Sequence, residues 1–162
     1  MPRPTNVTIP KYHWRPDPPD SRDYLYAAPP QMALPTLVDL RPGCSPIENQ
    51  GQLGSCTGQA IAGLIEYLGR KAKKNLDVSR LFIYYQERLL EGTVNYDSGA
   101  YIRDGIKAVN KFGAPLESLW PYIIGRFAIR PSATAYKDAL KRRVGAYRRC
   151  LLYTSPSPRD TR

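Results

Sequence analysis

The chain is organised around the stretch Gln50-Gly51-Gln52-Leu53-Gly54-Ser55-Cys56-Thr57-Gly58-Gln59-Ala60, a glycine-punctuated turn that leads into an apolar helical repeat. The turn delivers one thiol, Cys56, to the predicted first turn of a helix. Unpaired backbone N–H groups and the positive end of the helix dipole favour thiolate over thiol at such a position. The amide of Gln50 can fold back over the same turn and donate to an oxyanion. The stretch therefore predicts an attacking sulfur and half of a stabilising site.

Apolar residues continue at helical spacing beyond this turn. The first predicted helix begins at Ser55, ends in a group of cations, and has one apolar stripe made of Ala60, Ile61, Leu64, Ile65 and Leu68. The cations are Arg70, Lys71, Lys73 and Lys74, and they suit the negative end of a helix dipole.

Three further helices follow from the same kind of pattern. Ser79 is placed to cap a helix that closes near Gly92. Ile102, Ile106 and Val109 mark a helix that stops at Gly113, and a weaker one spans Ala133 to Val144. The segment 145–149 then resembles the first strand of a following sheet, but the alternation typical of a complete sheet is missing.

Both ends of the chain differ from this helical middle. Residues 1–35 are rich in proline, which interrupts helices and sheet ladders, so they are expected to form an extended arm. The arm either straps the body or lies across a cleft. Residues 150–162 have no periodicity and are expected to be a non-native or disordered tail, which leaves 36–149 as the folded domain.

The net charge of +10 raises the possibility of a nucleic-acid partner. Residues 131–162 contribute +6 of this excess, as eight Lys and Arg against two acids. A nucleic-acid site is expected to spread its cations over a folded face with aromatic side chains among them. The terminal concentration favours a solvated helix face, so no nucleic-acid partner is expected, and a basic nucleic-acid-binding domain remains an alternative.

Three cysteines, Cys44, Cys56 and Cys150, are too few and too scattered to predict a disulfide framework. Their spacing and the presence of one histidine argue against a metal site, and no cofactor is indicated. Cys44 is expected to be a partly buried structural thiol. No run approaches the ~18 apolar residues of a membrane span, and no signal peptide is recognisable. A cytoplasmic protein without membrane contact is therefore expected, with its oligomeric state left open.

Four motifs together resemble the papain-like cysteine peptidases. Leu53-Gly54-Ser55-Cys56-Thr57 resembles the family's C-G-[SA]-C-[WY] segment. Val38-Asp39-Leu40-Arg41 resembles its V-D-[WL]-R entry, Ser98-Gly99 its substrate-binding Gly-Gly, and Trp120-Pro121-Tyr122 its Y-P-Y. The likeness runs from Leu34 to Arg149. It implies an α+β papain-like fold, present here mainly as the helical lobe with an extended arm and little sheet.

The resemblance also implies site residues. Cys56 would attack a peptide carbonyl, and Gln50 would donate to the oxyanion. Gly54, Ser98 and Gly99 would bind the peptide or protein substrate. Gly99 also suits an ordinary helix entry. Without the resemblance, Cys56 would be interpreted as a small buried hydrophobe. Two positions depart from the pattern. Leu53 replaces a cysteine that is disulfide-bonded in secreted relatives, and Thr57 replaces an aromatic residue.

The family's catalytic histidine and asparagine follow the cysteine by roughly 130–150 residues, more than the sequence contains after Cys56. The one histidine, His13, lies in the proline-rich arm and is expected to be an arm residue and not the general base. The chain is therefore expected to be a fragment that is inactive alone. A catalytically dead papain-like binding module is the main alternative.

Overall fold

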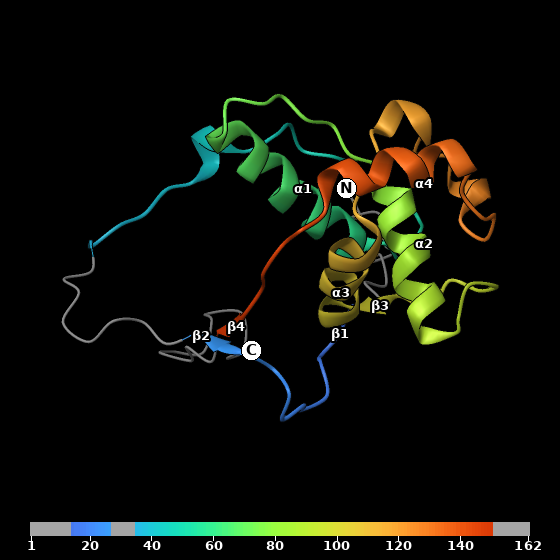
Figure 1. The fold of residues 1–162 in the computed structure, drawn as a ribbon, viewed down its shortest axis with the longest axis horizontal. Helices are drawn as coiled ribbons and strands as arrows, with labels where there is room; N and C mark the ends of the chain where they lie inside the picture. Colours follow the sequence, from blue (N-terminus) through green and yellow to red (C-terminus); the bar gives the residue numbers. More distant parts are fainter. Residues whose placement is uncertain (1–13, 27–34, 151–162) are drawn as a thin grey trace, which may run out of the picture.

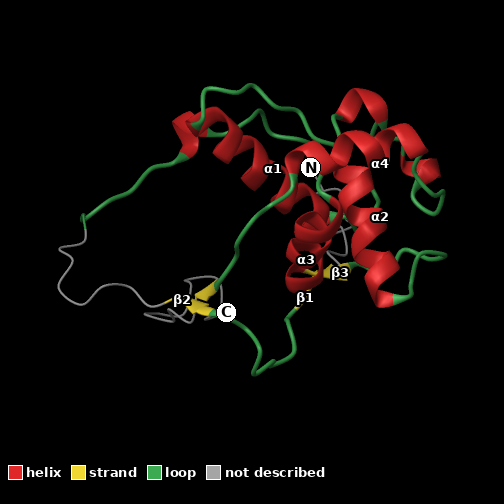
Figure 2. Cartoon of the chain, viewed as in Figure 1, coloured by secondary structure: helices red, strands yellow, loops and turns green. Residues whose placement is uncertain are grey.

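The computed structural model describes residues 14–26 and 35–150. Four α-helices make up most of it: α1 (Cys56–Lys71), α2 (Arg80–Glu91), α3 (Ile102–Phe112) and α4 (Ala133–Ala139). Four two-residue strands accompany them: β1 (Trp14–Arg15), β2 (Leu25–Tyr26), β3 (Ala100–Tyr101) and β4 (Arg149–Cys150). Figure 1 and Figure 2 show the helices gathered on one side, with the described arm residues 14–26 running along the lower edge of the view. The predicted fold, helical with little sheet, is confirmed.

Helix α2 forms the centre of the helical body and packs against both α1 and α3. Its residues from Arg80 to Arg88 are all buried, and Leu81, Phe82, Ile83 and Tyr84 are completely inaccessible. Two hydrophobic clusters share this helix, one containing Phe82 and Tyr84 and the other Ile83. Because residues 80–88 are buried on every side of the helix, α2 is the frame on which the other segments are placed.

The predicted cap at Ser79 and the predicted ends of α2 and α3 are confirmed. Ser79 caps α2, since its Oγ accepts a hydrogen bond from the Phe82 N–H at 3.1 Å. Gly92 ends the same helix in the left-handed conformation at φ 72°. Gly113 follows α3 with φ 76° and ψ −164°. Local cap chemistry of these residues therefore accounts for these boundaries.

The apolar stripe predicted for α1 is only partly buried, which corrects the sequence analysis. Leu64 and Leu68 are 48% and 51% exposed, and Ala60 is also exposed. The buried face of α1 includes small residues instead, because α2 crosses closely there: a Cβ on Gly58 would lie 3.0 Å from the carbonyl oxygen of Arg80. The helix also ends at Lys71, so Lys73 and Lys74 lie beyond it.

The end of the described chain differs from the predictions as well. Helix α4 stops at Ala139 and continues only as a 3₁₀ turn over Leu140–Arg142, short of the predicted Val144. The strand predicted for 145–149 is limited to β4, which pairs in parallel with β2 from the arm. Residues 151–162 and His13 lie outside the described residues.

The arm is attached to the body through Arg103 near the start of α3. The Arg103 backbone N–H donates to Asp17 at 3.1 Å, and its guanidinium donates to the Pro18 carbonyl at 2.5 Å and to Asp23 at 2.7 Å. Arg149 also pairs with Asp23, at 3.1 Å. Burial raises the pKa of Asp23, but the hydrogen bonds from Arg149 and Arg103 outweigh this effect and leave that pKa below its usual value.

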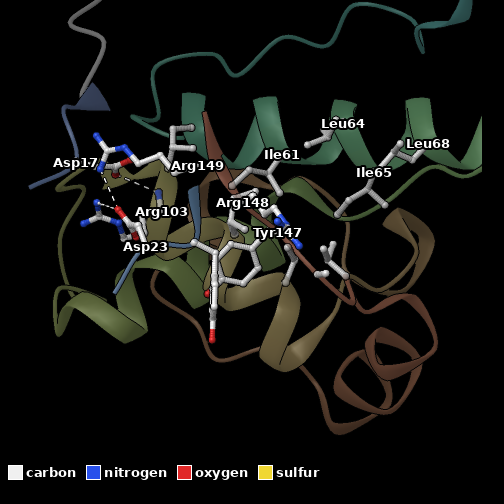
Figure 3. A pocket seen from close by; sticks show the side chains of 16 residues that line it. Asp17, Asp23, Ile61, Leu64, Ile65, Leu68, Arg103, Tyr147, Arg148 and Arg149 are labelled. Carbon is white, nitrogen blue, oxygen red and sulfur yellow. Dashed lines mark hydrogen bonds and ion pairs between the residues drawn. The ribbon is translucent and has the colours of Figure 1, made fainter. Parts of the chain in front are cut away.

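A second attachment is the parallel pairing of β1 with β3, in which Trp14 lies opposite Ala100. Beside the arm, α1, α3 and the segment before β4 enclose a hollow of about 380 Å³. Figure 3 shows Ile61, Ile65, Leu64 and Leu68 along one side of this hollow, with the Asp23, Arg103 and Arg149 group at one end. The exposed leucines of α1 therefore face this hollow.

Candidate active site

Cys56 is the first residue of α1 and is partly exposed, whereas Ser55 and Thr57 on either side of it are buried. Within the described part of the chain its sulfur forms no disulfide. The structure thus agrees with a thiol presented at a helix start, and it disagrees with the alternative of a fully buried hydrophobe. Cys44, expected to be partly buried, is exposed, and its thiol donates to the Leu40 carbonyl at 3.4 Å.

Gln50 is partly buried in the turn that precedes Cys56. Its side-chain amide donates to the carbonyl oxygen of Leu53 at 2.9 Å, which folds residues 50–53 into a closed loop. A primary amide carries two N–H hydrogens, so this bond uses one and leaves the other. The oxyanion role of Gln50 is compatible with this arrangement and stays a prediction.

A carboxylate that the sequence analysis did not identify joins Gly54 to the segment containing Ser98 and Gly99. The Gly54 N–H donates to both carboxylate oxygens of Asp97, at 3.1 and 2.9 Å. The Tyr84 hydroxyl donates a short hydrogen bond to the same carboxylate and accepts one from the Gly99 N–H at 3.1 Å. Burial and the bond to Asp97 raise the pKa of Tyr84. Three of the predicted site positions therefore lie together around this network.

Ser98 and Gly99 use their polar groups for hydrogen bonds within the chain. Gly99 is buried, and its N–H is already bonded to Tyr84. The Ser98 hydroxyl bonds to Thr93 and to the Gly99 carbonyl, each at 2.8 Å. A substrate that used the Gly99 N–H would have to displace Tyr84, and the substrate-binding role of Gly54, Ser98 and Gly99 remains a prediction.

Thr57, which departs from the family pattern, has a buried acid as its partner. Its hydroxyl donates to Glu87 on α2 at 2.6 Å. Glu87 is completely buried, and its other carboxyl oxygen has no hydrogen-bond partner among the described residues. Burial raises the pKa of Glu87 well above its usual value. Glu87 therefore favours its protonated form. It contacts Thr57, the residue that follows Cys56.

Because the folded chain holds the Glu87 proton more tightly than the unfolded chain does, its stability depends on pH. Above the usual pKa of a glutamate and below the raised one, only the folded chain keeps this proton, so the free energy of unfolding falls as pH rises, by at most about 1.4 kcal/mol per pH unit. Urea unfolding between about pH 5 and about pH 8 is expected to show this loss relative to Glu87→Gln. Parallel stability profiles for the two proteins would contradict it.

Neither a metal centre nor a membrane span is found within residues 14–26 and 35–150. No group of three or more His, Cys, Asp or Glu side chains among them is arranged to hold a metal ion. None of the helices formed by these residues combines the length and the hydropathy needed to cross a bilayer.

Comparisons with known proteins point to one class. No protein-family model matches the sequence. It is 44% identical over 108 residues to an uncharacterized peptidase C1-like protein of Acanthamoeba polyphaga mimivirus, a match covering 65% of this chain and 34% of the viral protein. The structure matches that of xylellain, a cysteine protease from Xylella fastidiosa, with a TM-score of 0.76 and 39% identity over 86% of this chain and 58% of xylellain.

A more distant match shows the fold alone. It is digestive procathepsin L 3 of the Tenebrio molitor larval midgut, with a TM-score of 0.57 and 16% identity over 77% of this chain and 40% of that protein. The chain thus spans about a third of the viral relative and less than two thirds of xylellain.

Proposed function

We propose that this chain, which is related to the papain-like cysteine peptidases and has the helical part of their fold, carries the nucleophile of a cysteine-type peptidase. The observation that supports this most directly is the partly exposed Cys56 at the first position of α1, between two buried residues. In this proposal residues 36–149 belong to the peptidase domain, residues 1–35 form the arm, and the substrate is a peptide or protein.

The proposed reaction begins with the Cys56 thiolate adding to a peptide carbonyl carbon. A carbon–sulfur bond forms, and the carbonyl π electrons move to oxygen. The backbone N–H of Cys56 and the second amide N–H of Gln50 would stabilise the resulting oxyanion. When the tetrahedral intermediate collapses, the carbon–nitrogen bond breaks, and the leaving amine takes a proton from a general acid to give an acyl-enzyme.

The described residues of this site include no clear proton donor or acceptor for the proton-transfer step. General acid–base help is worth roughly 10²- to 10⁴-fold in rate. The sequence contains one histidine, His13, which we propose is not the base. The 162-residue chain is therefore expected to hydrolyse a fluorogenic peptide slowly or not at all. Robust turnover that Cys56→Ala abolishes would contradict this expectation and still support the nucleophile.

The nucleophile itself is tested by site-resolved alkylation with iodoacetamide, followed by mass spectrometry. A thiol whose pKa is one unit lower has about tenfold more thiolate at a pH below both values. Cys56 is thus expected to react about tenfold faster at about pH 6 in the folded chain than in the urea-unfolded chain. The exposed Cys44 serves as an internal reference. Equal rates for folded and unfolded Cys56 would favour a dead binding module.

A further inference from the structure

The Tyr122 hydroxyl bridges the two ends of the turn that leads to Cys56. It donates to the backbone carbonyl of Gln50 at 2.9 Å and lies 2.5 Å from the Ser55 hydroxyl. A phenol has one hydrogen to give. Since that hydrogen goes to Gln50, the Ser55 hydroxyl must donate to the Tyr122 oxygen. The bridge therefore fixes both hydroxyl groups.

This assignment explains an unusual feature at the start of α1. Serine is a preferred N-cap residue because its oxygen accepts hydrogen bonds from N–H groups of the first turn. Ser55 occupies the N-cap position, yet its side chain makes no capping bond. Its hydroxyl is bonded to Tyr122 instead, so the first-turn N–H groups beside Cys56 are not taken by the serine oxygen.

Tyr122 is itself held firmly. Its ring lies against the Arg80 guanidinium, 4.6 Å from the ring centre, and its backbone N–H donates a short hydrogen bond to Glu117. Arg80 in turn pairs with Glu48 at 2.6 Å, in the segment that enters the turn. Burial raises the pKa of Tyr122, so the hydroxyl keeps its hydrogen at neutral pH. The bridge thus connects the turn to a tyrosine that Arg80 and Glu117 hold in place.

We propose that Tyr122 is a positioning residue for the oxyanion-binding side of this site. Its hydroxyl fixes the backbone at Gln50 relative to Ser55, which sets the distance between the Gln50 amide and the first-turn N–H of α1. It also diverts Ser55 from capping that turn. The assignment rests on the proposed function, because it has a catalytic meaning only if Cys56 adds to carbonyl groups.

The test compares two reactions of Cys56 in the full chain. A peptide aldehyde adds the Cys56 sulfur to its carbonyl carbon, and the carbonyl oxygen takes the thiol proton, giving a hemithioacetal whose oxygen occupies the oxyanion position. Iodoacetamide alkylates the same sulfur without forming an oxyanion. Tyr122→Phe is expected to weaken aldehyde binding about tenfold, as the loss of a well-placed hydrogen bond does, and to change the alkylation rate less than about twofold.

Tyr136→Phe is the matched control. The Tyr136 hydroxyl is also partly buried and accepts a hydrogen bond, from Gln86 at 2.7 Å, but it does not bond to the turn. This variant should bind the aldehyde like the unaltered chain. Ser55→Ala gives a second route, because it removes the other half of the bridge and should reproduce the Tyr122→Phe effect without adding to it in the double variant.

The possible outcomes separate the two proposals. If the unaltered chain forms no adduct at Cys56, the proposed function fails. If it forms the adduct and Tyr122→Phe binds the aldehyde equally well, only the role of Tyr122 is overturned. A parallel loss of aldehyde binding and alkylation would also overturn it, since general loosening of the turn affects both reactions.

Discussion

Replacing Asp97 with alanine is expected to lower the free energy of unfolding by about 3 kcal/mol and to free the turn before Cys56. The substitution leaves two donors without an acceptor, the Gly54 N–H and the hydroxyl of the buried Tyr84. Each buried group left unsatisfied costs about 1–3 kcal/mol. Urea unfolding measures the loss, and hydrogen exchange at Gly54 reports the release of the turn.

Two other variants make this result specific to Asp97. Asp97→Asn keeps the shape and one acceptor oxygen, so we expect a smaller loss than with alanine. Asp39→Ala removes an exposed acid whose partner is the exposed Arg41, and surface pairs of this kind contribute about 0–1 kcal/mol. Equal effects of Asp97→Ala and Asp39→Ala would show that the hydrogen bonds accepted by Asp97 contribute nothing to the free energy of unfolding.

Gly113→Ala is expected to lower the free energy of unfolding by about 4 kcal/mol or more. Gly113 has a combination of φ 76° and ψ −164° that almost only glycine adopts. A Cβ there would also lie 1.9 Å from the carbonyl oxygen of Ala139 at the end of α4. Losses above about 4 kcal/mol come from severe local conflicts of this kind. Thermal and urea unfolding of the variant measure the effect.

Gly63→Ala is the matched control. Gly63 lies inside α1, and a Cβ there would meet no atom within 4 Å. Alanine favours a helix over glycine by roughly 0.5–1 kcal/mol, so this variant should be more stable than the original chain. If Gly113→Ala were as stable as Gly63→Ala, the expected clash between a Cβ at position 113 and the end of α4 would be contradicted.

The boundaries of α2, the end of α3 and the place of Cys56 were predictable because they depend on neighbours in the sequence. Ser79 caps α2 through a backbone N–H three residues away, and Gly92 ends it through its own backbone conformation. The same locality explains why a thiol after a glycine-rich turn is found at the first position of α1. In each case the interacting groups lie within one turn of the chain.

The contacts around the site were not predictable in this way. Asp97 reaches Gly54, and Thr57 reaches Glu87, across long sequence separations. No periodicity identifies which acid will become a partner. Tyr122 stood out only through its motif, and nothing in that motif showed that its hydroxyl reaches Gln50 and Ser55. The exposure of Leu64 and Leu68 was missed because periodicity identifies an apolar stripe, whereas packing decides which part of it is covered.

By itself the sequence determined the four helices, the cap and end of α2, and the delivery of one thiol to a helix start, because hydrogen bonds to near neighbours and side-chain periodicity establish these features locally. Only the tertiary structure decided which groups hold the segments on either side of that thiol. The carboxylate of Asp97, the acid of Glu87 and the hydroxyl of Tyr122 come from distant segments. Buried polar groups are stable mainly where they find hydrogen-bond partners in space, and the packing around α2 sets which partners are in reach.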